Sequence, residues 1–102
     1  MVSRRISDIQ RKTLKILHLI SEREGDNHYP IPATALFKMV SVNTQHTIAA
    51  SNYRTSCHTL VKRGLLSQYR NTKTARLAYK LTPDGKQQAK GICDKEGVHS
   101  NS

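Results

Sequence analysis

The sequence predicts a mostly helical α+β domain with a three-helix core, a two-stranded hairpin and a short C-terminal helix. Apolar residues recur at helical spacing in three successive segments, and they alternate with polar residues near the end of the hairpin region. A length of 102 residues suits one domain. Apolar residues make up 36% of the chain, with no Trp and one Phe, so aliphatic side chains must fill most of a small core.

The first helix is predicted over residues 8–24. Ser7 and Gln10 form an S-x-x-Q pattern, which is typical of a capping box at a helix N-terminus. Apolar residues such as Ile16 then follow at helical spacing, and Gly25 stands near the expected end.

A second helix is expected after a loop over residues 25–32 that is rich in turn formers. Ile31 lies between two prolines and can form at most a very short extended segment. Pro32 suits the first turn of this second helix, which should end near Ser41. The polar stretch at residues 42–47 then predicts a connecting turn.

The third helix should begin at residue 48 or 49 and run to Arg63. Thr47 or Ser51 could cap its start, and Gly64 can adopt the left-handed conformation that closes a helix. Its expected apolar face comprises Ala50, Tyr53, Cys57, Leu60 and Val61.

A hairpin follows, with strands over residues 66–69 and 76–81 and a turn over residues 71–74. The return strand alternates apolar and polar residues, so its period is two. Tyr69 and Tyr79 are expected to meet across the two strands.

The last helix should begin with Thr82 as its cap and Pro83 in its first turn, and end near Gly91. Residues 8–91 would then form the domain. A polar, disordered tail is expected over residues 92–102. A basic arm is expected over residues 1–7, to which Arg4, Arg5, Arg11 and Lys12 would contribute.

Joined by a short turn, the second and third helices would form a helix-turn-helix. The run Leu60-x-x-x-Gly64-Leu65-Leu66, the basic hairpin and the run Leu81-Thr82-Pro83-Asp84-Gly85 resemble winged-helix regulators of the MarR and PadR kind. The resemblance covers residues 8–91 and implies a winged helix-turn-helix that binds DNA. The chain departs from the MarR pattern in lacking long terminal helices for dimerisation, and in size it is more similar to small plasmid, phage or fimbrial-operon regulators.

The charge of the chain indicates a polyanionic partner. Lys and Arg number 17 against 7 Asp and Glu, which gives a net charge of +10. DNA, RNA and an acidic membrane surface all fit this imbalance, as does a soluble basic surface without a partner. Too few aromatic residues are expected at the surface for stacking RNA bases. No segment has the length and apolarity of a membrane span or signal peptide, so a cytoplasmic protein is expected. The resemblance to winged-helix regulators implies a bacterial source or a mobile element.

The polar face of the third helix is the predicted site. Arg can bridge two acceptors on guanine, Asn can do the same on adenine, and Thr can pack on a thymine methyl group. The alternatives are a solvated helix face, complementation of the helix dipole by Lys62 and protection of a strand edge by the hairpin cations. The predicted base contacts are Asn52, Arg54, Thr55 and His58, and the predicted backbone contacts are Ser51, Thr59, Lys62, Arg70, Lys73 and Arg76.

Metal and catalytic sites are not expected. His46, Cys57 and His58 follow no zinc-binding spacing, and no pair of carboxylates suits acid-base catalysis. We therefore predict no cofactor, no metal and no enzymatic activity. Cys57 and Cys93 are expected as reduced thiols.

These observations favour a sequence-specific, double-stranded DNA-binding transcription regulator. The alternative is a winged helix that docks onto a partner protein and binds nucleic acid only non-specifically. A homodimer is possible, with Leu14 and Leu19 of the first helix as its candidate contacts.

Overall fold

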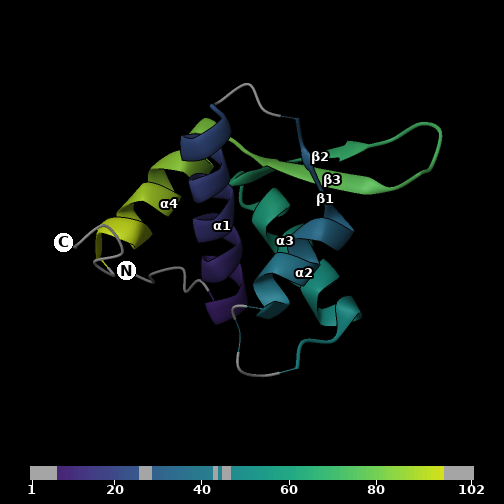
Figure 1. Cartoon of the computed structure of the whole chain (residues 1–102), viewed down its shortest axis with the longest axis horizontal. Coiled ribbons are helices and arrows are strands. Elements are labelled where there is room, and N and C mark those ends of the chain that lie inside the picture. The colour runs from purple at the N-terminus through teal and green to yellow at the C-terminus, as the bar shows by residue number, and fades with distance from the viewer. Residues whose placement is uncertain (1–6, 26–28, 43, 45–46, 96–102) are drawn as a thin grey trace.

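A computed structural model describes residues 7–25, 29–42, 44 and 47–95. Helices α1 and α2 and strand β1 come first, followed by α3, the hairpin β2–β3 and α4 (Figure 1). This arrangement confirms the predicted mostly helical α+β fold with a winged helix-turn-helix. The bounds are Asp8–Glu24 for α1, Ile31–Pro32 for β1, Ala33–Val42 for α2, Ala50–Lys62 for α3, Leu66–Arg70 for β2, Leu77–Leu81 for β3 and Pro83–Lys95 for α4.

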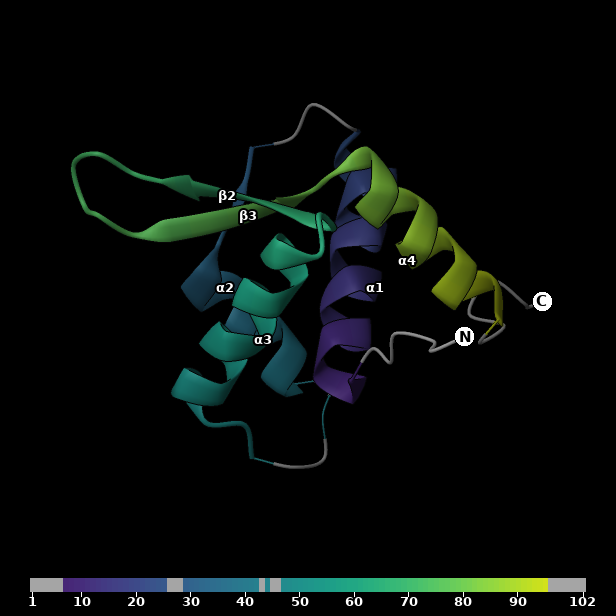
Figure 2. The same cartoon turned by 180° about the vertical axis from the view of Figure 1, so that it is seen from behind.

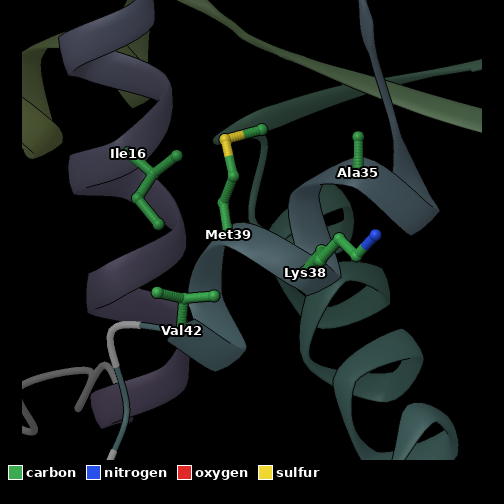
Figure 3. A pocket seen from close by; sticks show the side chains of 5 residues that line it. All are labelled: Ile16, Ala35, Lys38, Met39 and Val42. Atoms are coloured by element: carbon green, nitrogen blue, oxygen red, sulfur yellow. The ribbon is translucent and has the colours of Figure 1, made fainter.

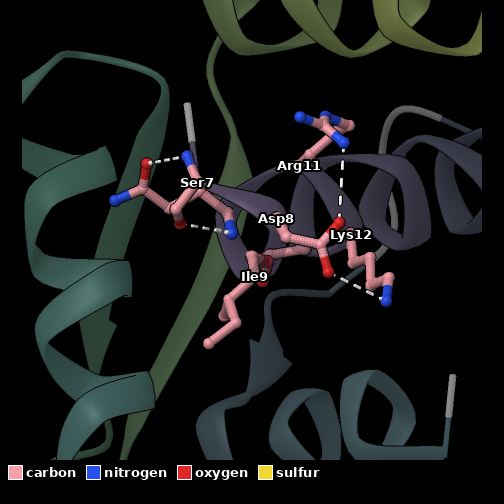
Figure 4. A network of polar contacts seen from close by, with 7 residues as sticks. Ser7, Asp8, Ile9, Arg11 and Lys12 are labelled. Carbon is pink, nitrogen blue, oxygen red and sulfur yellow. Dashed lines mark hydrogen bonds and ion pairs between the residues drawn. The ribbon is translucent and has the colours of Figure 1, made fainter. Parts of the chain in front are cut away.

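The predicted capping box at the start of α1 is confirmed (Figure 4). The Ser7 backbone N–H donates to Gln10 Oε1 at 3.1 Å, and the Gln10 backbone N–H donates to Ser7 Oγ at 3.2 Å. Asp8 pairs with Lys12 at 3.0 Å and with Arg11 at 3.5 Å. The sequence predicted that Arg11 and Lys12 contribute to the basic N-terminal arm, but both lie in α1 beside the Asp8 carboxylate. The remaining arm cations, at positions 4 and 5, lie outside the described residues.

Helix α1 lies at the centre of the helical layer, with α4 on one side of it and α2 and α3 on the other (Figure 1). Leu14 is fully buried, whereas Leu19 is 50% exposed. The prediction that Leu14 contacts a second copy is therefore wrong, because its side chain belongs to the core of its own chain. The largest fully buried side chains are Tyr79, Leu14, Leu17, Leu36, Leu60, Val40, Thr13 and Cys57.

The described strands form an antiparallel sheet in the order β1-β3-β2. The very short extended segment predicted around Ile31 is confirmed, because Ile31 pairs with Tyr79. Pro32 belongs to this strand and pairs with Ala78, so its predicted place inside α2 is wrong. An edge strand tolerates proline because the missing N–H can face away from the sheet.

The register of the hairpin separates the two tyrosines that were expected to meet. Tyr69 pairs with Ala78, and Gln68 pairs with Tyr79. Neighbouring residues of a strand point to opposite faces, so this offset of one residue places Tyr69 and Tyr79 on opposite sides of the sheet. Tyr79 is 1% exposed and Tyr69 is 47% exposed.

Helix α4 continues to Lys95, beyond the predicted end at Gly91. Ile92 packs against the core and Cys93 is buried, so the helix gains apolar contacts from another turn. The prediction that residues 92–95 belong to a polar tail is therefore wrong, and residues 96–102 lie outside the described residues. In the part of the chain described here, no helix has both the length and the apolarity to cross a membrane.

Candidate nucleic-acid interface

Helix α3 carries the predicted base-contacting residues, and it begins without a side-chain cap. Its N-cap is Ala49 in an extended conformation, so the prediction that Thr47 or Ser51 caps it is wrong. The helix ends at Lys62, and Gly64 follows with a φ of 78°, in the left-handed region that glycine adopts at low cost.

The inner side of α3 is fixed by Tyr53. The Tyr53 hydroxyl lies 3.0 Å from Thr13 Oγ1 of α1, and its ring centroid lies 5.4 Å from that of Phe37 in α2. Thr13 Oγ1 also lies 2.8 Å from the Ile9 carbonyl oxygen, to which it donates, so the Thr13 hydroxyl links Tyr53 to the backbone of α1. Burial raises the pKa of Tyr53, and burial also raises the pKa of the Cys57 thiol to about 11. Tertiary contacts of α3 therefore set which of its sides faces outward.

The outer side of α3 displays all four predicted base-contacting residues. Asn52, Arg54, Thr55 and His58 are all exposed, and helical spacing places Thr55 and His58 away from the buried Tyr53, with Asn52 and Arg54 on the two flanks. Figure 2 is seen from the side on which α3 stands in front of α2. Arg54 lies close enough to Tyr79 to oppose the upward shift that burial gives the pKa of that tyrosine. It therefore lies where the exposed side of the helix meets the sheet.

Three residues of α3 were predicted to contact the DNA backbone. Ser51 and Lys62 are exposed, and Thr59 is half-buried. The Thr59 hydroxyl donates to the Thr55 carbonyl oxygen at 3.0 Å, and the Thr55 hydroxyl donates to the Ser51 carbonyl oxygen at 3.1 Å. These hydroxyls are thus paired within the helix, while each keeps lone pairs that a ligand can use.

The hairpin β2–β3 and the loop over residues 71–76, together called the wing, extend beyond the helices (Figures 1 and 2). The Asn71 side-chain oxygen accepts from the backbone N–H of Lys73 at 2.8 Å and of Thr74 at 3.0 Å. Ala75 has a φ of 60°, so the turn is longer than the predicted residues 71–74. The sequence predicted Arg76 in the return strand, but Arg76 lies in this loop.

The three cations predicted for the wing are all exposed, but the register gives them different directions. Arg70 pairs with Leu77, and alternation along β2 places it on the face that also carries the buried Leu66. Gln68 is exposed and lies on the same face, and it was not among the predicted contacts. Lys73 and Arg76 belong to the projecting tip.

The wing, α3 and α4 meet at Thr82. The Thr82 hydroxyl donates to the Gly64 carbonyl oxygen, and the Thr82 backbone N–H donates to the Leu65 carbonyl oxygen at 3.1 Å. The Gly85 backbone N–H donates to Thr82 Oγ1 at 2.9 Å, which confirms Thr82 as the cap of α4. A Cβ atom at Gly85 would overlap with the Leu65 carbonyl oxygen. In the Leu-Thr-x-x-Gly run, the threonine is thus needed as a helix cap, and the glycine is needed because a larger residue would overlap with the backbone at Leu65.

The residues discussed for metal binding do not converge where the structure describes them. Cys57 is buried on the inner side of α3, and His58 is exposed on the outer side. Within the described ranges, no group of three or more His, Cys, Asp or Glu residues could hold a metal ion. His46 lies outside the described residues.

The fold defines the class of the protein as a winged helix. No family model and no curated protein matches the chain, whereas solved structures do. The adhesin competence repressor AdcR from Streptococcus pyogenes matches 92% of the chain with 18% identity and a TM-score of 0.67. MepR, a transcription regulator of the Staphylococcus aureus multidrug efflux pump MepA, matches 95% of the chain with 14% identity and a TM-score of 0.64.

These neighbours differ in length from the chain. The chain spans 60% of AdcR and 67% of MepR. A protein from Ralstonia eutropha JMP134 is closer in size: the chain covers 98% of it, with 86% of the chain matched, 17% identity and a TM-score of 0.68. The chain therefore shares the winged-helix fold of these neighbours, and it spans about two thirds or less of AdcR and MepR.

Proposed function

We propose that this protein is a sequence-specific, double-stranded DNA-binding transcription regulator. One observation carries the proposal: the side of α3 turned away from the core exposes side chains that can bond base edges, beside a projecting wing with exposed cations. The net charge of +10 and the winged-helix fold shared with AdcR and MepR support it. In this function α3 lies in the major groove, and the wing lies on the backbone or in the minor groove.

Base recognition is assigned to the exposed side of α3. Arg54 would form two hydrogen bonds to a guanine, and Asn52 two to an adenine. Each such pair contributes about 1–3 kcal/mol of discrimination against the wrong base. Thr55 and His58 lie on the same side, where Thr55 would contact a thymine methyl group and His58 an acceptor on a base.

Backbone contacts supply the salt-dependent part of the affinity. Four of the assigned residues are cations, and about four neutralised phosphates give a slope of about −3.6 for log affinity against log salt concentration. The assigned residues are Ser51, Thr59, Lys62, Arg70, Lys73 and Arg76.

The proposal is tested by selecting binding sites from random duplex DNA at two salt concentrations. We expect an enriched motif that survives the higher salt, and its symmetry would report whether a monomer or a homodimer binds. Arg54→Ala should weaken binding to that motif about tenfold or more, because it removes a bidentate contact. Lys90→Ala in α4 is the matched control and should leave the affinity unchanged.

Two results would count against this function. If no motif is enriched and binding disappears as salt rises, the chain is better explained as a protein-interaction module with non-specific nucleic-acid binding. If Arg54→Ala binds the motif as tightly as the natural protein does, Arg54 does not contact a base.

A further inference from the structure

An apolar groove lies between α1 and α2 (Figure 3). Val42 at one end of it is 80% exposed, although valine is among the residues most often buried. The groove has a volume of about 470 Å³ and is open to solvent. It is lined by Ile16, Ala35, Lys38, Met39 and Val42.

The groove faces away from the proposed DNA-binding surface. Helix α2 lies in front of α3 in Figure 1, and the order is reversed in Figure 2, where the molecule is seen from behind. The close view of the groove likewise places α3 behind α2 (Figure 3). DNA bound to the outer side of α3 would therefore leave the groove accessible.

The apolar surface continues past the groove along α1. Leu19 is 50% exposed and follows Ile16 by three residues, so it lies on the adjacent part of the same helix surface. Single exposed apolar residues are common, but exposed apolar residues that gather on one side of two helices form a candidate interaction surface. Met39 in the middle adds an unbranched side chain that can adapt to a partner.

The charges around the groove are positive on balance, with three cations against two carboxylates. Lys38 is the charged residue among those lining it. On α1, Lys12 stands four residues before Ile16, and Arg23 and Glu24 stand seven and eight residues after it, which places all three on its side of the helix. Asp8 neutralises part of this charge through its ion pair with Lys12. A partner with carboxylates beside its apolar residues would complement the surface.

A second copy of the chain fits this surface poorly. A two-fold interface would bring the same cations of both copies together. It would also point the two α3 helices in opposite directions, away from a single duplex. The charge and the position of the groove both favour a different protein.

We propose that the groove between α1 and α2 binds an acidic amphipathic helix of a partner protein. Apolar residues at helical spacing would occupy the surface between Ile16 and Val42, and carboxylates on the flank would pair with Lys38. The protein could then hold DNA on one face and its partner on the other.

The test uses the full chain and two peptides of about 15 residues, long enough to form a helix on binding. One peptide has leucines along one face and glutamates along the other. The second has the same composition with the leucines scattered. We expect the amphipathic peptide to bind and to shift the NMR amide signals of Ile16, Lys38 and Val42. The scrambled peptide should bind at least tenfold more weakly.

Variants locate the contact. Val42→Asp should weaken binding of the amphipathic peptide about tenfold, because it puts a charge into the apolar contact. Lys38→Glu should weaken it a few-fold. Lys90→Glu, an equal charge reversal on α4, should leave it unchanged.

Three results would overturn the proposal. Equal binding of both peptides would show that only net charge matters for binding. If neither peptide binds, the groove is not a binding site for such a helix. Self-association that Val42→Asp abolishes would identify a second copy as the occupant. The affinity of Val42→Asp for DNA is expected to match that of the natural protein. A failure of the peptide-binding proposal is therefore distinguishable from a failure of the proposed DNA binding.

Discussion

Helix α3 and the tip of the wing both carry predicted DNA contacts, but they are held in place by different kinds of interaction. Tyr53 anchors α3 through long-range contacts with Thr13 and Phe37. The wing tip is shaped by hydrogen bonds among its own residues, chiefly those accepted by Asn71. The orientation of α3 therefore depends on the core, whereas the shape of the tip is set locally.

This difference has consequences for dynamics. Residues 71–76 are all exposed, so little buried surface opposes movement of the tip. Segments with few buried contacts open at low free-energy cost, while elements packed in the core open only with much of the fold. In the proposed function, a fixed α3 suits base readout and an adaptable wing suits contact with the DNA backbone.

The largest effect is expected where the two regions meet. Gly85→Ala would place a Cβ atom onto the Leu65 carbonyl oxygen, a backbone atom that cannot move without shifting the base of the wing. We expect it to lower the free energy of unfolding by about 3 kcal/mol or more. Urea denaturation measures the change.

Gly91→Ala is the matched control for that substitution. Gly91 lies in the same helix and has nothing within 4 Å of the position its Cβ would take. It should stabilise α4 by about 0.5–1 kcal/mol, since alanine favours the helix. Equal effects of the two substitutions would show that the close approach at Gly85 is unimportant.

The second prediction concerns the buried side of α3 at high pH. Burial raises the pKa of Cys57 from 9.0 to about 11. Above pH 9 the unfolded thiol loses its proton while the folded one keeps it, so the unfolded state gains stability as pH rises. Between pH 9 and 11 this should cost about 2 kcal/mol. Denaturation at several pH values should show a steeper decline for the natural protein than for Cys57→Ala, and equal slopes would contradict the assignment.

A smaller effect is expected from the anchor of α3. Tyr53→Phe removes one buried hydrogen bond and leaves the Thr13 hydroxyl paired with the Ile9 carbonyl oxygen. The free energy of unfolding should therefore fall by about 1 kcal/mol. Tyr69→Phe, which alters an exposed hydroxyl on the wing, should change it by less than about 0.5 kcal/mol. If both variants are equally stable, the contact with Thr13 does not anchor the helix.

The sequence predicted the faces of α3 because they follow from helical spacing. Tyr53 and Cys57 are inside and Asn52 and Arg54 are outside, as the period requires. It could not predict the hairpin register, which depends on a loop that extends to Ala75 with a positive φ. Such a backbone conformation is uncommon for alanine, so no residue type marked the end of the turn.

The sequence was also a poor guide to the surfaces of α1 and to the end of α4. Leu14 and Leu19 flank the main apolar stripe of α1 on its two sides, yet Leu14 is buried and Leu19 is exposed. The packing of α4 on α1 decides this difference, and helical spacing alone does not predict it. Cys93 stands in a polar stretch, and its burial likewise depends on this long-range contact. Periodicity identifies one buried face of a helix, but it does not show that a second helix covers an adjacent face of the same helix.

The smallest expected effect lies at the wing tip. Ala75→Gly should stabilise the protein by up to about 1 kcal/mol, because alanine in the left-handed region carries a steric cost that glycine avoids. Ala78→Gly should have the opposite sign, since Ala78 lies in β3 between Pro32 and Tyr69, where glycine weakens a strand. Thermal denaturation of the two variants would measure both. If Ala75→Gly destabilised the protein as Ala78→Gly does, the tip would not be held in the left-handed conformation, and the local shape that distinguishes the wing from α3 would not exist in solution.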